Sequence, residues 1–114
     1  MTELRPNTAT TAGALSLELS DAPVDQTVSG RPQTGSAALG SIGGVEVGVW
    51  EMTVGTMRDV ESEEFFVVLS GSAVVEFEDG TEPLHLITGD VARLAPGTRT
   101  VWTVSEPLRK IYLS

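Results

Sequence analysis

The residues best suited to chemistry in this chain are carboxylates that lie close together in the sequence. Four of the six residues from 59 to 64 are acidic, and Glu51 precedes them. Carboxylates act as general acids or bases, pair with cations, or bind hard cations such as Mg²⁺ and Ca²⁺. Imidazole and thiolate dominate zinc, iron and copper sites, yet the chain holds one histidine, His85, and no cysteine. The residue types therefore indicate acid–base or binding chemistry.

Strand alternation argues against a hard-cation site within this acidic run. Successive side chains of a strand point to opposite faces, so Glu63 faces solvent if Glu64 faces the interior. A solvated acidic loop that leads into a strand is the favoured interpretation, and a carboxylate-bound metal ion is the alternative. We expect no metal and no cofactor.

Glu64 is the candidate catalytic residue. Phe66 and Val68 share its parity in the following strand, so its carboxylate is expected among apolar walls. An ionised carboxylate in such surroundings needs a cationic partner or takes up a proton. Arg58 has the same parity and is the expected partner. A carboxylate of this kind suits general acid–base catalysis, and the alternative is a purely structural ion pair.

Three of the six aromatic side chains, Trp50, Trp102 and Tyr112, fall within expected strands. They could line a pocket and stack on a planar ligand, although a place in the core or in a dimer interface is the more frequent role. Thr100 has the same parity as Trp102, so we expect both to point inward.

The basic residues of the second half offer a weaker signal. Two of them converging on an interior site would bind a carboxylate or a phosphate. Because Arg109 and Lys110 are adjacent, one of them must face outward. His85 lies between Leu84 and Leu86, which alternation sends inward, so we expect it on the outside with no chemical role. The basic residues concerned are Arg93, Arg99, Arg109 and Lys110.

Short strands must position these side chains. The run 65–69 is apolar on both parities and should be buried on both faces. Asp79-Gly80 predicts a type I′ hairpin turn, which needs positive φ. Short strands separated by turns about every eight to twelve residues are typical of a sandwich or a barrel. The expected strands are 15–19, 45–53, 65–69, 72–78, 83–88, 91–94, 100–104 and 108–113.

The chain is expected to form one domain with three segments. Residues 1–14 lack periodicity and are predicted to be a flexible arm. Residues 15–44 begin with a short strand and are then rich in Gly, Pro, Ser and Asp, which predicts an extended segment that packs on the barrel or on a partner subunit. Residues 45–114 are predicted to form the barrel. A chain of 114 residues has room for one core of this kind.

Composition and charge narrow the class of function. The net charge is −9, with seven basic residues scattered among sixteen acidic ones, which argues against nucleic acid as a partner. No apolar stretch reaches the ~18 residues that span a bilayer, so no membrane partner is expected. The first residues lack the basic start and apolar block of a secretory signal, and there is no cysteine for a disulfide. We expect a cytoplasmic protein.

Several motifs recur along the chain at characteristic spacing. They are Gly48-Val49-Trp50-Glu51, Glu64-Phe65 leading to Leu69-Ser70-Gly71, Gly89-Asp90 leading to Pro96-Gly97, Trp102, and Leu108 to Tyr112. Together they resemble the cupin superfamily, and in particular the small single-domain cupins related to (S)-ureidoglycine aminohydrolase, over roughly residues 21–114. The resemblance implies an all-β fold, a jelly-roll β-barrel of two packed antiparallel sheets, and formation of a homodimer.

The resemblance also implies where a metal site would lie. In metal-dependent cupins, one motif supplies two histidines and a glutamate, and a second motif supplies a third histidine. Glu64 matches the glutamate. The first two histidine positions fall on Arg58 and Val60, or on the residue before each if the loop is longer, and the third falls on Thr100. None of these residues is a histidine, so the resemblance implies a cupin without its usual transition metal.

The leading hypothesis is a small-molecule-binding cupin. Its ligand would be a small polar metabolite bearing a carboxylate or amide, with Glu64 as acid–base and Arg58 holding the anion in a deamination, isomerisation or elimination. Two alternatives stay open: a non-catalytic ligand-binding or sensor module, and a dimeric interaction protein whose lumen is packed core. The expected lumen residues are Trp50, Arg58, Glu64, Phe66, Thr100 and Trp102.

Overall fold

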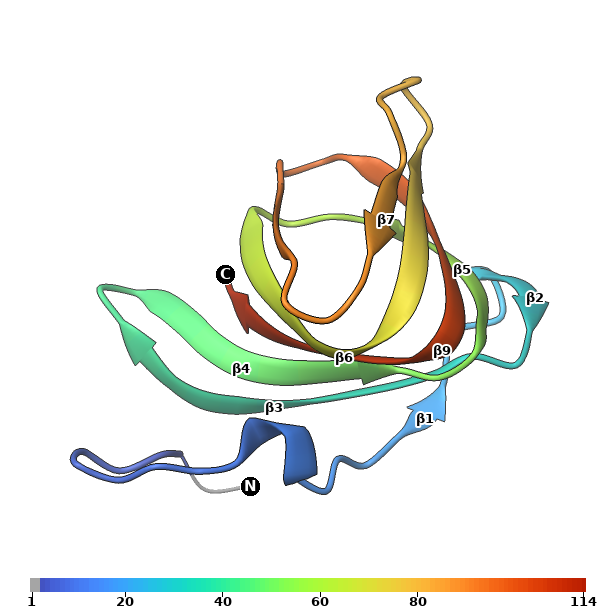
Figure 1. Cartoon of the computed structure of the whole chain (residues 1–114). Helices are drawn as coiled ribbons and strands as arrows, with labels where there is room; N and C mark the ends of the chain where they lie inside the picture. Colours follow the sequence, from blue (N-terminus) through green and yellow to red (C-terminus); the bar gives the residue numbers. More distant parts are fainter. Residues whose placement is uncertain (1–2) are drawn as a thin grey trace.

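The computed structural model describes residues 3–114, and nearly all its regular structure is β-strand (Figure 1). A single 3-10 turn, η1 (Ala12–Ala14), precedes the strands. No helix among the described residues has the length and hydropathy that crossing a membrane requires. The strands are β1 (Ser20–Asp21), β2 (Thr27–Gly30), β3 (Gln33–Ile42), β4 (Val45–Met52), β5 (Gly55–Val60), β6 (Glu64–Phe77), β7 (Leu84–Leu86), β8 (Val91–Leu94) and β9 (Arg99–Leu113).

All strand pairings are antiparallel, and β9 joins the two layers of the barrel into one continuous sheet. One half of β9 pairs with β4, the other half pairs with β5, and most of its length pairs with β6. The sheet curls around an interior, with β6 and β9 bending across it (Figure 1). The prediction of an all-β, single-domain barrel is confirmed.

The bend in β6 and β9 has a local cause. The pairing register shifts between Val68 and Ser70 and again on either side of Ser72. Between these serines, Gly71 has a φ of +86°, and a Cβ at this position would collide with the carbonyl of Pro107. Glycine adopts this φ without strain and allows the close approach. The resulting bulge turns the two longest strands over the interior.

The apolar core lies on the inward faces of β6 and β9. Phe66, Val68 and Trp102 are at most 2% exposed. Full burial of a side chain such as Val or Phe contributes about 1.5–3 kcal/mol. The same inward faces carry Glu64 and Lys110, which are also buried. The core therefore continues directly into a polar site.

The prediction of a type I′ turn at Asp79-Gly80 is wrong. Gly80 has a φ of +86°, but Asp79 has a negative φ, and its carboxylate instead accepts hydrogen bonds from the backbone and hydroxyl of Thr81 at 2.9 and 2.6 Å. A two-residue turn with positive φ at both positions occurs between β3 and β4, at Gly43 (+59°) and Gly44 (+81°). A side-chain hydrogen bond stabilises the ordinary φ of aspartate, whereas two glycines need no such support.

The strand content of residues 15–44 differs from the prediction. Residues 33–42 form β3, which pairs with β4 along its whole length. The sequence did not predict this strand, because most of its residues are small and few have the β-branched or aromatic side chains typical of strands. The expected strand at 15–19 forms no hydrogen-bonded ladder. Its three leucines are half-buried and alternate with exposed residues, as predicted. Only Ser20–Asp21 pairs with β3, so the alternation identified burial and not strand pairing.

The predicted arm, residues 1–14, begins outside the described residues. From residue 3 onward it lies along the sheet on the side away from the lumen (Figure 1). The backbone N–H of Leu4 donates to the carbonyl of Leu39 at 2.7 Å. Nη1 of Arg109 donates to the carbonyls of Ala12 and Leu15 at 3.0 and 2.7 Å. The flexibility of this arm, and packing of residues 15–44 on a partner subunit, stay predictions.

The prediction that residues 65–69 are buried on both faces is wrong for the outer face. Phe66 and Val68 are buried, but Phe65 is 46% exposed. Across the sheet, Phe65 has Leu113 of β9 on one side and Arg93 of β8 on the other. No further layer of the described chain covers these side chains, so β6 carries an apolar outer face in contact with solvent.

Candidate functional site

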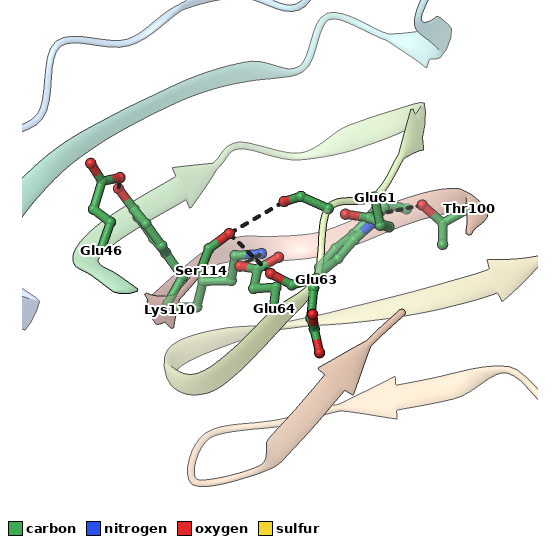
Figure 2. Close-up of polar contacts among 10 residues, drawn as sticks. Glu46, Glu61, Glu63, Glu64, Thr100, Lys110 and Ser114 are labelled. Atoms are coloured by element: carbon green, nitrogen blue, oxygen red, sulfur yellow. Dashed lines mark hydrogen bonds and ion pairs between the residues drawn. The ribbon is translucent and has the colours of Figure 1, made fainter. Parts of the chain in front are cut away.

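A cavity of about 250 Å³ opens in the barrel beside the ends of β5 and β9. Its wall combines two tryptophan rings with three carboxylates, one ammonium and several hydroxyl groups. Figure 2 shows the polar residues that surround it. The lining residues are Ser36, Trp50, Met57, Asp59, Val60, Glu61, Ser62, Glu64, Trp102, Lys110, Tyr112 and Ser114.

A buried ion pair lies at the wall of this cavity. Nζ of Lys110 is 2.9 Å from Oε1 of Glu64, and the two side chains are 6% and 8% exposed. Glu64 opens β6, and Lys110 lies opposite Val68 in the neighbouring β9, so the two side chains share the inward face. Lys110, and not Arg58, is therefore the partner of Glu64.

Three aromatic rings surround the ammonium of Lys110. Their centroids lie 4.6 Å (Trp50), 4.4 Å (Phe66) and 4.8 Å (Trp102) from Nζ, within the range of cation–π attraction. The rings also pack on one another, with both the Trp50–Trp102 and the Phe66–Trp102 centroids 5.7 Å apart. The aromatic cage and Glu64 together fix the position of the ammonium.

Glu61 is the second buried carboxylate of the site. Its Oε2 accepts hydrogen bonds from Oγ1 of Thr100 at 2.6 Å and from Nε1 of Trp102 at 2.9 Å (Figure 2). Backbone hydrogen bonds from Glu61 N–H to the Thr98 carbonyl and from Gly97 N–H to the Glu61 carbonyl, both 2.8 Å, hold its loop against the turn before β9. These contacts fold the β5–β6 loop inward.

Asp59 is the third carboxylate and lies near the end of β5. Burial raises the pKa of Asp59, and the negative charge of Glu61 raises it further. A hydrogen bond from the Val60 N–H and the charge of Lys110 act in the opposite direction without cancelling the rise. The lumen therefore carries more negative charge than its single ammonium compensates.

Tyr112 and two serines line the opening. Oη of Tyr112 donates to Oε2 of Glu46 at 2.7 Å. Burial and this hydrogen bond raise the pKa of Tyr112 to about 12, so the phenol stays protonated at neutral pH. Gly48 lies opposite Tyr112 in β4, where a Cβ would overlap the ring. On the other side of the opening, Oγ of Ser114 lies 3.3 Å from Oγ of Ser62 and donates to the carbonyl of residue 63 (Figure 2).

The structure brings together most of the lumen residues expected from the sequence. Glu64, Trp50 and Trp102 line the cavity directly. Phe66 and Thr100 are fully buried behind it, where Phe66 contacts the ammonium and Thr100 positions Glu61. Their predicted roles in catalysis and ligand binding stay predictions.

Arg58 does not join these residues. It is exposed and lines a separate recess of about 220 Å³ together with Arg99. The loop between β5 and β6 breaks the alternation on which its expected place depends. Met57, Asp59 and Glu61 line the cavity at odd-numbered positions, and the exposed pair 62–63 shifts the inward parity to Glu64. His85 is exposed, as alternation predicts. The sequence analysis considered Lys110 only among four basic residues that would bind an anion if two of them converged, and Glu61 only within the acidic run. It included neither among the expected lumen residues.

The donor set does not fit the transition metal that metal-dependent cupins bind. The expected histidine positions hold Arg58, Val60 and Thr100, and none offers an imidazole. Among residues 3–114, no three side chains of His, Cys, Asp or Glu converge as a metal site requires. The ammonium of Lys110, 2.9 Å from Glu64, would also repel a divalent cation at that carboxylate.

Solved structures of several proteins are similar to this chain. A DUF861-family protein of unknown function from Pseudomonas syringae pv. tomato is 28% identical with a TM-score of 0.76, over 93% of this chain and 46% of that one. A DUF861-family protein from Thermotoga maritima is 32% identical with a TM-score of 0.52, over 56% of this chain and 73% of that one.

The EutQ protein of Clostridium difficile is 16% identical with a TM-score of 0.62, over 72% of this chain and 67% of that one, and this similarity shows the fold alone. No curated protein matches the chain significantly. A family model described as an EutQ-like cupin domain matches residues 39–112, which is more than half of the chain. The chain therefore belongs to the cupin superfamily, as a member of the family of EutQ-like cupin domains.

Proposed function

We propose that this protein binds a small polar molecule in the lumen of its barrel and that Glu64 acts on the molecule as a general acid–base. The observation that carries this proposal is the buried Glu64–Lys110 ion pair at the wall of a cavity. Such pairs contribute little net stability, because the cost of removing both charges from water offsets their attraction. Contact with a ligand is a better reason for a buried pair to lie beside an empty volume.

Glu64 has the geometry for proton transfer. Oε1 is paired with Lys110, Oε2 has no hydrogen-bond partner among the described residues, and the side chain lines the cavity. Oε2 takes a proton from the ligand or returns one, and the ammonium beside it stabilises the carboxylate form. Deamination, isomerisation and elimination all include such a transfer. An aminohydrolase-like reaction, suggested by the sequence resemblance to ureidoglycine aminohydrolases, is one form of this proposal.

A non-catalytic binding module is the second candidate, and the fixed geometry of the wall favours it. Glu61 is held by Thr100 and Trp102, and Glu64 is held by Lys110. A preorganised wall lowers the cost of binding whether or not a reaction follows. The third possibility, a packed structural core, is less favoured because the aromatic rings leave a cavity of about 250 Å³ beside the carboxylates.

The two tryptophans make a direct binding assay possible. They are the only tryptophans in the chain, and both line the cavity. A panel of small polar metabolites is added to ¹⁵N-labelled protein, and the two indole N–H signals are followed by NMR. We expect a true ligand to move both signals to saturation. Each ligand is then incubated with the protein, and its own proton spectrum is followed for conversion.

Matched variants separate the outcomes. Glu64→Gln removes the candidate acid–base, and Glu76→Gln makes the same change at an exposed position of β6. We expect conversion to stop in Glu64→Gln and to continue unchanged in Glu76→Gln. Binding without conversion by the wild type would support the non-catalytic module. Conversion that persists in Glu64→Gln would remove the catalytic role, and a panel without any saturable ligand would count against binding in the lumen.

A further inference from the structure

We propose that the ligand of the lumen is a small organic cation with N–H donors, such as an amine or a guanidine. This inference rests on the proposed function and specifies the chemical class of its ligand. It follows from which hydrogen-bonding atoms of the cavity are still free to meet a ligand.

Most of the hydrogen-bond donors around the cavity are already used within the protein; the hydroxyl of Ser36 is the exception among the described lining residues. Oγ1 of Thr100 and Nε1 of Trp102 both donate to Glu61. The hydroxyl of Tyr112 donates to Glu46. The ammonium of Lys110 is paired with Glu64 and enclosed by aromatic rings. A ligand that presents acceptors, such as a carboxylate or a phosphate, would find few donors without breaking these contacts.

Acceptor atoms, in contrast, remain free. The Thr100 and Trp102 bonds use Oε2 of Glu61, and the Lys110 pair uses Oε1 of Glu64, which leaves one oxygen of each carboxylate without a protein partner. Both residues are 7% exposed. In the described part of the chain, no side-chain oxygen is both shut off from solvent and unpartnered. These two oxygens therefore reach the cavity.

The charges of the wall favour the same class of ligand. Asp59, Glu61 and Glu64 line the cavity with Lys110 as the one cationic side chain, so the wall has a surplus of negative charge. The neighbours Glu61 and Glu64 both contribute to the raised pKa of Asp59, which shows the carboxylates acting on one another. A bound cation lowers this repulsion, whereas an anion increases it.

The arrangement favours an extended donor group over a metal ion. The carboxylates face one cavity, yet within residues 3–114 no three of them converge on a point where a metal could bind. An ammonium or guanidinium group carries several N–H donors that point in different directions, so it can meet separate acceptors. A volume of about 250 Å³ limits the ligand to a small molecule.

A series of three probes with one carbon skeleton tests this inference. Butylammonium chloride, butyramide and sodium butyrate differ in charge and in donor capacity but little in size. Each is titrated into ¹⁵N-labelled protein at constant ionic strength, and the two indole N–H signals are followed. We expect butylammonium to bind at least about tenfold more tightly than butyramide, because charge-assisted hydrogen bonds are the stronger ones, and butyrate to give no saturable shift.

Two variants are expected to change the affinity for butylammonium in opposite directions. Glu64→Gln should weaken butylammonium binding about tenfold, because one charged acceptor is lost. Lys110→Met should strengthen it, because a like charge leaves the wall, so the test does not depend on the folding of a single variant. Glu76→Gln, which is exposed on the same strand, should leave binding unchanged.

The outcomes distinguish this inference from the proposed function. If butyramide or butyrate bound at least as tightly as butylammonium and depended on Glu64, the cation class would be wrong and binding in the lumen would stand. The cation class would also be wrong if Lys110→Met weakened butylammonium binding. Butylammonium binding equally affected by Glu64→Gln and Glu76→Gln would mean surface attraction and would overturn the inference. If neither the probes nor the metabolite panel gave saturable shifts, both proposals would fall.

Discussion

Lys110 places a primary ammonium between Trp50, Phe66 and Trp102, with Glu64 as its counter-ion. Removing one member of a buried pair leaves the other charge uncompensated, at a cost of about 3–5 kcal/mol. Loss of either charge therefore destabilises the fold, although the two charges together add little net stability. This interdependence keeps the cavity wall preformed when no ligand is bound.

Asp59 leads to a prediction about pH. Burial and the charge of Glu61 raise the pKa of Asp59 above its ordinary value of 3.8. The folded protein then holds this proton more tightly than the unfolded chain does. The stabilisation is fully present below pH 3.8 and is lost as the pH rises through the folded-state pKa. Once Asp59 is ionised, its charge therefore destabilises the fold.

Asp59→Asn should consequently raise the melting temperature at pH 7 and change it much less near pH 3.5. Thermal unfolding of wild type and variant at both pH values measures this difference. Asp25→Asn serves as the control, because Asp25 is an exposed residue of the same charge. A variant that is less stable than wild type at pH 7 would show that Asp59 makes a favourable interaction that outweighs its burial.

At the scale of elements, β9 connects the lumen to the arm on the opposite side of the sheet. Lys110 points inward, and its neighbour Arg109 points outward, where it pairs with Glu51 at 2.8 Å and donates to the carbonyls of Ala12 and Leu15. The two ionic side chains are 11% and 19% exposed. Arg109 is thus the main polar contact between the arm and the barrel.

Arg109→Leu should release the arm. We expect a loss of about 2–4 kcal/mol in the free energy of unfolding, because Glu51 is left half-buried without its partner. Hydrogen exchange of residues 3–19 should increase more than that of β6. Arg31→Leu is the matched control: Arg31 pairs with Asp21 at the surface, where the side chains are 82% and 50% exposed, so a much smaller loss of stability is expected. Unchanged exchange of residues 3–19 would show that apolar contacts, such as those of the half-buried leucines at 15, 17 and 19, hold this segment without Arg109.

Alternation along single strands predicted most of the lumen. It placed Glu64 and Phe66 of β6, and Thr100 and Trp102 of β9, on the inward side, because a strand without irregularity keeps its parity. It failed for Arg58, because the inward parity changes in the β5–β6 loop between Glu61 and Glu64. The partner of Glu64 comes from β9 and not from the preceding strand. Contacts between strands far apart in sequence depend on register, which one strand does not reveal.

The same reasoning explains the errors in the fold. Residues 33–42 form β3 through backbone pairing with β4, although their Gly, Ala and Ser side chains carry no strand signal. Conversely, the leucines at 15, 17 and 19 gave a strand signal where half-burial is present without a ladder. Side-chain patterns report which face is covered, and hydrogen-bond partners must come from the rest of the structure.

At the scale of the whole molecule, the outer face of β6, β8 and β9 carries several exposed apolar side chains. Val91 is 67% exposed, Phe65 46% and Leu113 37%. The strand pairings place Leu113 opposite Phe65 and Val91 opposite Val67, so these side chains form one apolar patch. Exposed apolar patches of this kind often mark interaction sites.

A second copy of this chain is the partner that we expect for this patch. The molecule has a net charge of −9, which disfavours random association of its surfaces. The edge of the patch, however, carries one positive and one negative side chain. Arg93 and Glu63 form an ion pair there at 3.2 Å, and their side chains are 61% and 64% exposed. In a two-fold symmetric dimer, the patch of one copy packs against the same patch of the other. Arg93 of one copy can then pair with Glu63 of the other while the apolar residues pack together.

Val91→Glu tests this expectation. In sedimentation equilibrium, we expect the wild type to have twice the monomer mass and Val91→Glu to shift toward the monomer, because a buried unpaired carboxylate would oppose association. Val24→Glu adds the same charge at a residue that is 94% exposed in the turn between β1 and β2, and it should leave the mass unchanged. Raised salt should weaken the Arg93–Glu63 contacts but spare the apolar packing, so the wild-type dimer should persist. A wild type that sediments as a monomer throughout would assign the patch to a different partner, and equal dissociation by both variants would assign the effect to net charge alone.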